Sequence, residues 1–114
     1  MNRGDIYWAN LDPTVDSEQA GKRPVVIVSR DAINRSSPVV VVVPLTKFTS
    51  KKKIYPSQHL INATTSNGLE TDSIAKCDQI RAIAVSRLID RCGSLEAEDL
   101  KKLDSALKIT LFLK

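Results

Sequence analysis

The feature that most constrains the fold is a run of five valines, Val39–Val43, enclosed by two prolines. β-Branched side chains are restricted at χ1 and suit the pleated surface of a strand. Proline lacks the backbone N–H of a central strand residue, so Pro38 and Pro44 each mark a strand end, an edge or a bulge. A second run, Pro24–Ser29, is almost wholly apolar and predicts a strand that is buried on both faces.

The remaining pattern adds four strands and one helix. Short or alternating apolar segments predict strands at Asp5–Leu11, Gln58–Ile61, Asp72–Ile83 and around Ile89–Cys92. An amphipathic C-terminal helix that packs on the sheet is predicted by leucines at helical spacing, namely Leu100, Leu103, Leu107 and Leu111. About six short strands and one terminal helix favour a mainly β fold, a small SH3-like barrel, with residues 1–114 as a single domain.

Two long polar loops follow the first and third expected strands, at Asp12–Lys22 and Lys47–Ser57. Because loops on a rigid scaffold usually carry function, we expect them to meet at one rim and form the site there. Arg23 stands at the mouth of a buried strand beside the first loop. Taken alone, this arginine can simply pair with Glu18 or Asp12.

Composition limits the chemistry that the chain can support. Seventeen Lys and Arg against 13 Asp and Glu give a net charge of +4, which permits a polyanionic partner without requiring one. Two cysteines, Cys77 and Cys92, and a single histidine, His59, form no metal-binding pattern. No catalytic triad or phosphate loop is present. We therefore expect no metal and no cofactor.

No segment approaches the length of about 18 apolar residues needed to cross a bilayer, and the N-terminus lacks the long apolar stretch of a signal peptide. We expect a cytoplasmic protein with no membrane partner. From the residues alone, the chain is a small, mildly basic β-barrel for which nucleic-acid binding is one option.

Four segments from Arg3 to about Leu111 add a family resemblance. They read RGDIYWANLDPTVDSEQAGKRPVVIVS, PVVVVVPLT, DSIAKCDQIRAI and RLIDRCGSL, the last followed by the amphipathic helix. In this order they resemble the MazF/PemK/Kid-type toxins of bacterial toxin–antitoxin modules. The resemblance implies the CcdB/MazF-like toxin fold, a homodimer, and a ribosome-independent endoribonuclease that cuts single-stranded RNA at a short sequence. It also implies a cognate antitoxin whose acidic, flexible tail blocks the RNA groove.

The resemblance also implies the site residues. The catalytic positions are Arg23, Thr46 and Asp78. The substrate-binding positions are Ser17, Glu18, Gln19, Lys76 and Gln79. Relatives with the basic-x-acidic pair often carry arginine where this chain has Lys76, which keeps the charge but loses bidentate phosphate geometry.

Metal-free RNA cleavage can use the ribose 2′-OH as the nucleophile, leaving a 2′,3′-cyclic phosphate and a 5′-OH. The enzyme must align that hydroxyl and stabilise charge on the phosphoryl oxygens. Arg23 offers a permanently charged fork and Thr46 a hydroxyl donor. Asp78, Arg23 and water all remain candidates for proton transfer. Phe48, in the loop after Thr46, is the expected rim aromatic.

A non-catalytic alternative belongs to another functional class. CcdB-type toxins have the same barrel and poison DNA gyrase through a C-terminal helix with an exposed aromatic tail. This chain ends ITLFLK, so Phe112 could serve that role. Only the nuclease hypothesis predicts discrete RNA fragments in EDTA.

Overall fold

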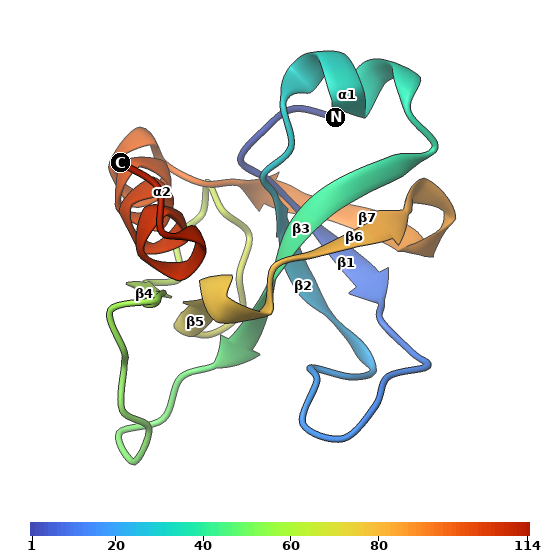
Figure 1. Cartoon of the computed structure of the whole chain (residues 1–114). Coiled ribbons are helices and arrows are strands. Elements are labelled where there is room, and N and C mark those ends of the chain that lie inside the picture. Colours follow the sequence, from blue (N-terminus) through green and yellow to red (C-terminus); the bar gives the residue numbers. More distant parts are fainter.

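The valine run forms β3 (Val39–Lys47), which organises the sheet in the computed structural model of residues 1–114 (Figure 1). One side of β3 pairs with β2 (Lys22–Ile27). On the other side, the first half of β3 pairs with β6 (Arg81–Ala84), and its last residues pair with β5 (Ser73–Lys76). One long strand therefore belongs to both halves of the sheet.

The sheet extends from β3 in the order β4–β5–β3–β2–β1–β7, and β6 is attached to β3 alone. Its three other strands are β1 (Asp5–Asn10), β4 (Gln58–Ile61) and β7 (Leu88–Ser94). Every pairing is antiparallel. No pairing joins β4 to β7, so the sheet is barrel-like but not closed. The mainly β class predicted from the sequence is confirmed.

The segment Asp72–Ile83, predicted as one strand, is two strands separated by the 3₁₀ turn η1 (Cys77–Gln79). The two strands pair with different stretches of β3, and Pro44 lies between those stretches. Because proline has no N–H to donate, it favours a break in the pairing at this point. The break turns the chain and places η1 beside the end of β3, where a continuous strand would not have put it.

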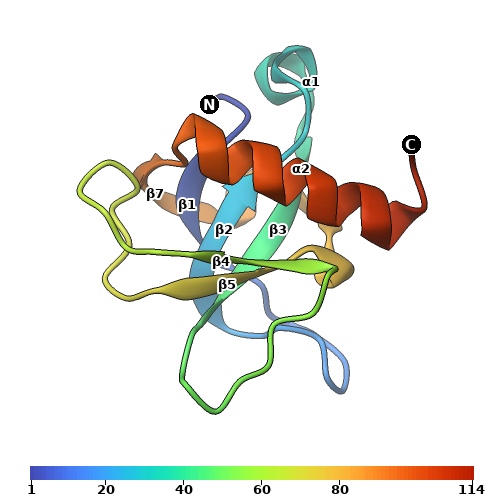
Figure 2. The same ribbon diagram turned by 90° about the vertical axis from the view of Figure 1, so that its left-hand side faces the viewer.

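Helix α2 (Ala97–Leu111) lies across the β4–β5 side of the molecule (Figure 2). Leu103 and Leu107 are buried against the sheet, as predicted, but Leu111 is 47% exposed. The Nε2 atom of His59 in β4 lies 2.9 Å from a carboxylate oxygen of Asp99 in α2 and fixes the helix to the sheet edge. The shorter helices are α1 (Asp31–Ser36) and the 3₁₀ turn η2 (Val85–Arg87). None of the helices is both long and apolar enough to span a membrane.

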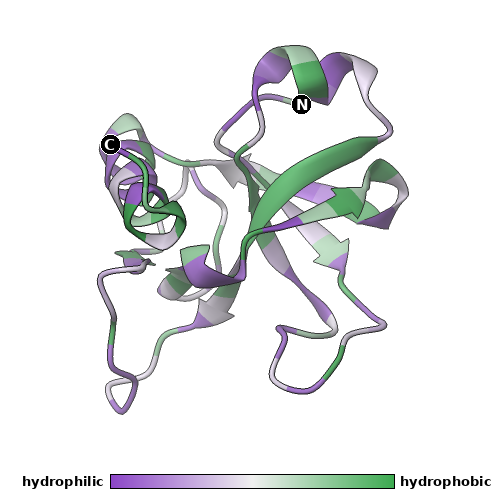
Figure 3. Ribbon diagram, viewed as in Figure 1, coloured by the Kyte–Doolittle hydropathy of each residue, from purple (hydrophilic) through white to green (hydrophobic).

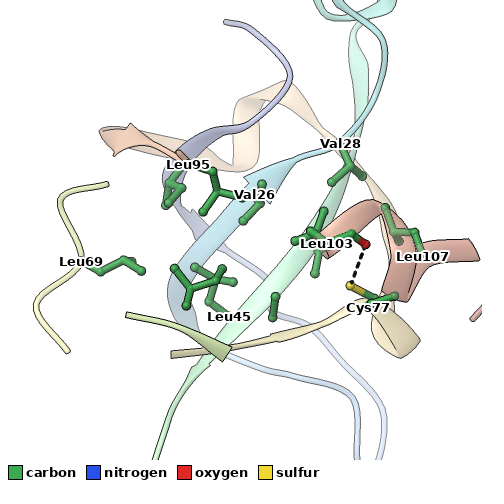
Figure 4. Packing of buried hydrophobic residues seen from close by; sticks show 13 residues of the cluster. Val26, Val28, Leu45, Leu69, Cys77, Leu95, Leu103 and Leu107 are labelled. Carbon is green, nitrogen blue, oxygen red and sulfur yellow. Dashed lines mark hydrogen bonds between the residues drawn. The ribbon is translucent and has the colours of Figure 1, made fainter. Parts of the chain in front are cut away.

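The hydrophobic core has two parts, one on each face of the sheet. Val26 and Leu45 belong to the cluster beneath α2, in which the Cys77 thiol lies 3.9 Å from the Leu103 carbonyl (Figure 4). Val25 and Val42 belong to the cluster on the opposite face. Alternate residues of β2 and β3 thus point to two separate cores, and the hydropathy colouring shows β3 as an apolar band (Figure 3). Because both faces of β2 and β3 are buried, these strands carry apolar residues at consecutive positions rather than at alternate ones.

The two long loops, between β1 and β2 and between β3 and β4, extend from the same end of the molecule (Figures 1 and 2). Helix α1 lies at the other end. The sequence-based expectation that the loops share a rim is therefore correct. The turn η1 lies beside the β1–β2 loop, to which its residue Gln79 is hydrogen-bonded.

Candidate functional site

The largest cavity lies between the β1–β2 loop and η1 and has a volume of about 430 Å³. We call it the Gln79 cavity, and it is lined by Ser17, Glu18, Gln19, Pro44, Asp78, Gln79, Ile80 and Arg81. Five of the eight predicted site residues meet here, although about 60 positions separate the two segments that carry them. The interruption of the β5–β6 segment is what brings Asp78 and Gln79 to the loop.

Hydrogen bonds from Gln79 hold the β1–β2 loop in place. The main-chain N–H of Gln19 donates to Oε1 of Gln79 at 2.7 Å, and the Gln79 amide nitrogen lies 3.4 Å from the Ser17 carbonyl. Within the loop, Glu18 accepts a hydrogen bond from the N–H of Val15 at 2.6 Å. The loop is therefore closed on itself and fixed to η1, which gives the cavity a defined wall.

A second depression adjoins the first on the outer face of the β3–β5–β4 strands and has a volume of about 360 Å³. We call it the Tyr55 groove, and it is lined by Gln19, Thr46, Lys52, Lys53, Tyr55, Gln58, Ile74 and Lys76. Gln19 lines both depressions, so they adjoin at this residue. Here the Lys52 ammonium donates to the Thr46 hydroxyl at 3.3 Å and to the Lys47 carbonyl at 2.6 Å. The hydroxyl thus lies in a cationic setting.

Arg23 is half-buried at the start of β2 and is held by main-chain carbonyls. Its Nε donates to Ala20 at 2.8 Å, and Nη1 lies 3.4 Å from the Leu45 carbonyl, one residue before Thr46. Continuing the β2–β3 register by two residues from the Val25–Pro44 pair also places Arg23 opposite Thr46. No carboxylate forms an ion pair with Arg23, so the pairing with Glu18 or Asp12 does not occur.

Arg23 also lines a smaller depression of about 210 Å³ beside Trp8, which we call the Trp8 pocket. Arg23, Thr46 and Asp78 therefore line three separate depressions around the end of β3. No hydrogen bond or ion pair joins these three side chains directly. They surround the strand end without forming a preassembled triad, and each lines a different depression.

The predicted rim aromatic, Phe48, does not line any of the three depressions. Phe48 is half-buried. Tyr55 is the aromatic residue that lines the Tyr55 groove; it is 51% exposed, and the Lys53 ammonium lies 5.3 Å from its ring centroid. Gln58 was also missed, although the alternation of β4 could have placed it on the outer face. Lys76 lies opposite Gln58, as the β4–β5 register shows.

The cysteines take no part in this site. Burial, followed by the nearby charge of Asp78, raises the pKa of Cys77 to about 12, so its thiol stays protonated at neutral pH. Burial also raises the pKa of Cys92 above its usual value. The structure places no three His, Cys, Asp or Glu side chains where they could together hold a metal ion.

The sequence matches the family described as PemK-like, MazF-like toxin of type II toxin–antitoxin systems over residues 2–111. It is 42% identical to endoribonuclease MazF9 of Mycobacterium tuberculosis, over 99% of this chain and 98% of that protein. It is also 42% identical to endoribonuclease EndoA of Bacillus subtilis, over 99% of this chain and 96% of that protein.

Solved structures show the same fold. A mycobacterial endoribonuclease in complex with its cognate antitoxin superposes with a TM-score of 0.80 at 25% identity, covering 100% of this chain and 97% of that one. MazF from Deinococcus radiodurans superposes with a TM-score of 0.83 at 22% identity, covering 99% of this chain and 97% of that one.

Proposed function

The chain belongs to the PemK-like, MazF-like toxins of type II toxin–antitoxin systems, and from this premise we propose that it is a sequence-specific endoribonuclease that acts on single-stranded RNA without the ribosome. The observation that carries the proposal is the placement of an unpaired guanidinium and a hydroxyl at one strand end. Arg23 has no carboxylate partner and reaches the main chain of Leu45, while the next residue, Thr46, presents its hydroxyl to the Tyr55 groove.

The reaction that fits these groups is an in-line displacement within the RNA. The ribose 2′-oxygen attacks the adjacent phosphorus, and the bond from phosphorus to the 5′-oxygen of the next nucleotide breaks. The proton of the 2′-OH passes to a base, and a proton is delivered to the leaving 5′-oxygen. The products are a 2′,3′-cyclic phosphate and a 5′-OH, and no metal is required.

Arg23 and Thr46 serve the phosphoryl group in this proposal. Negative charge builds on the non-bridging oxygens as the 2′-oxygen attacks, and preorganised donors stabilise that charge. The planar Arg23 fork suits two oxygens at once, and its Nε–H is already oriented by the Ala20 carbonyl. The Thr46 hydroxyl accepts a hydrogen bond from Lys52 in this structure. In the reaction it would donate its own proton in a hydrogen bond to a phosphoryl oxygen, as the third contact. The rigid end of β3 keeps these donors aligned.

Proton transfer is assigned on ordinary acid–base grounds. A guanidinium keeps its proton throughout the physiological range, so Arg23 is a poor base and acts through its charge. Asp78 lines the adjoining Gln79 cavity and is the carboxylate we propose as the base, directly or through one water. Ser17, Glu18, Gln19 and Gln79 form the wall that contacts the substrate, and Lys76 attracts its phosphates from the other side.

The partners follow from the same proposal. A structural neighbour is described as an endoribonuclease in complex with its cognate antitoxin, which supports an antitoxin partner for this chain. We propose that the acidic, flexible tail of that antitoxin covers the RNA groove, that the toxin is a homodimer, and that it acts in the cytoplasm. The three lysines of the Tyr55 groove would attract such a tail.

The test is incubation of the purified chain with a long single-stranded RNA in EDTA. Discrete fragments that carry a 5′-OH and a 2′,3′-cyclic phosphate are expected, and the same RNA with deoxyribose before each cut should resist. Fragments that require Mg²⁺, or cleavage of the deoxyribose substrate, would contradict the mechanism.

The gyrase alternative has one structural observation in its favour, since Phe112 is 97% exposed at the end of α2. Arg23 and Thr46 are not needed for it, and both curated relatives are named endoribonucleases. The same experiment separates the two functions, because a gyrase poison leaves the RNA intact.

A further inference from the structure

We propose that the Tyr55 groove is a nucleotide subsite, in which Tyr55 stacks on one RNA base and Lys52 and Lys76 hold the adjoining phosphates. The subsite would bind the nucleotide next to the phosphate that is cut at Thr46. This inference rests on the proposed function and adds to it the groups that select and hold one neighbouring base.

The floor of the groove is a rigid part of the sheet. Thr46 pairs with Ile74 across β3 and β5, and Lys76 pairs with Gln58 across β5 and β4. Residues directly opposite one another in an antiparallel pair share a face, so these four side chains form two adjacent rows. The opposite face is covered by α2, to which His59 of β4 is bonded. No helix packs on the outer face, where Thr46, Gln58 and Lys76 are partly exposed and Ile74 is buried.

The aromatic wall is held in place by its neighbours. The N–H of Tyr55 donates to Oε1 of Gln58 at 3.3 Å, and Lys53 lies over the Tyr55 ring. This arrangement leaves the amide NH₂ of Gln58 free to donate to the edge of a base that stacks on Tyr55. Stacking is tolerant of base identity, whereas the Gln58 amide can favour one base over another.

Charge in the groove favours the phosphates of a nucleic acid. Three of the lining residues are lysines and none is acidic. The Gln79 cavity beside it is mixed in charge, since its lining includes Glu18 and Asp78 as well as Arg81. An acidic peptide could pair its carboxylates with the lysines, but carboxylates do not stack on the half-exposed Tyr55 ring or need the free Gln58 amide as a hydrogen-bond donor. The combination of ring, amide and ammonium groups matches a nucleotide better.

Two measurements on the full chain test the subsite. The first is the affinity for a fluorescein-labelled, randomised 10-nucleotide single strand with 2′-O-methyl ribose, which cannot be cleaved. Tyr55→Ala and Tyr55→Leu should each weaken binding by roughly 10-fold to 100-fold, the range for losing one stacked base. Tyr55→Phe should stay within about 2-fold, because the ring is kept. Lys52→Gln should reduce the slope of log affinity against log salt concentration by about 1, the value for one lost phosphate contact.

Phe112→Ala is the matched control, since it removes an exposed aromatic ring at the far end of α2 and should leave the affinity unchanged. The second measurement maps the cut sites on a long RNA. Tyr55→Ala should raise KM with kcat retained, and Gln58→Ala should broaden base preference at one position beside the cut. Equal melting temperatures for all variants would show that the effects are not due to unfolding.

The outcomes separate the subsite from the nuclease function. If the wild-type chain leaves RNA intact but binding still depends on the Tyr55 ring, the nuclease proposal fails and the subsite stands. If the chain cleaves RNA and Tyr55→Ala changes neither affinity nor cut pattern, the subsite is rejected. If only the lysine substitutions weaken binding, the groove is an anion-binding surface suited to an acidic peptide, and the subsite is again rejected.

Discussion

The side-chain oxygen of Gln79 accepts a hydrogen bond from the main-chain N–H of Gln19 at 2.7 Å, although 60 positions separate the two residues. The Gln79 amide nitrogen faces the Ser17 carbonyl of the same loop. A single side chain on a 3₁₀ turn therefore fixes the wall of the largest cavity. The position of the β1–β2 loop depends on where β5 ends.

Removing the Gln79 side chain should loosen this loop. In Gln79→Ala, the Gln19 amide loses its partner, and its hydrogen-exchange rate should rise roughly 5-fold to 10-fold, as for the loss of about 1 kcal/mol. KM for RNA should rise several-fold with a smaller change in kcat, because the loop forms the binding wall. Gln79→Glu keeps the accepting oxygen and should retain most of the protection. Unchanged exchange at Gln19 in Gln79→Ala would contradict the assigned contact.

Substitutions at the end of β3 should affect the chemical step. Thr46→Val keeps the shape of threonine without the hydroxyl, and we expect the single-turnover rate to fall about 100-fold, the scale for losing one preorganised donor. Thr46→Ser should recover most of that loss. Thr49→Val, on the exposed part of the β3–β4 loop, is the matched control and should cleave normally.

Substitution of Arg23 should lower the cleavage rate at least as much as substitution of Thr46. Arg23→Lys keeps the charge but loses the planar fork and the Nε bond to Ala20, so a fall of about 100-fold or more is expected. Single-turnover cleavage and a melting curve measure activity and folding separately. Wild-type rates in an Arg23→Ala, Thr46→Ala double variant would reject the site assignment.

Much of the fold could be predicted because its elements are specified locally. The valine run and residues 25–28 consist of β-branched side chains; the first lies within β3, and the second starts within β2 and runs one residue past its end at Ile27. Leu103 and Leu107 fall on the buried face of α2, as their spacing requires. Leu111 departs from the pattern because the last turn of the helix extends past the sheet. Helical spacing fixes a face but not the length of the surface that covers it.

The parts that could not be predicted depend on contacts distant in sequence. The break at Cys77–Gln79 follows from how β5 and β6 pair around Pro44 of another strand, which strand propensity does not include. Tyr55 rather than Phe48 lines the groove, because the path of the β3–β4 loop decides which ring faces it. The site residues themselves came from the family motifs, and their chemical roles remain predictions.

Asp5 should make the stability of the fold sensitive to acid. Burial alone would raise the pKa of this carboxyl, but the N–H of Asn2, the Ser94 hydroxyl and the Arg91 guanidinium outweigh burial and lower the pKa below its usual value. A lowered pKa stabilises the folded state above the unfolded pKa of about 3.9, and this stabilisation is lost as pH falls through the folded value. The free energy of unfolding should therefore decrease below about pH 4.

Asp5→Asn tests that assignment. The amide cannot carry the charge that Arg91 and the two donors stabilise, so the variant should be less stable at pH 7 by about 1 to 3 kcal/mol. Its stability should also vary less between pH 5 and 2, as measured by urea denaturation at each pH. Asp90→Asn, at an exposed carboxylate on β7, should keep the pH profile of the wild type. Parallel profiles for wild type and Asp5→Asn would show that Asp5 does not carry the effect.

The thiol of Cys77 should be inert in the folded protein. Burial raises its pKa to about 12, so at pH 8 only about one molecule in 10,000 carries the reactive thiolate. Cys77 also lies within the core beneath α2, where an alkylating reagent cannot reach it without local unfolding (Figure 4). In a Cys92→Ser variant treated with iodoacetamide, mass spectrometry should show labelling at least about 100-fold slower than in urea. Rapid labelling of the native variant would mean that α2 opens from the sheet far more often than its buried leucines allow.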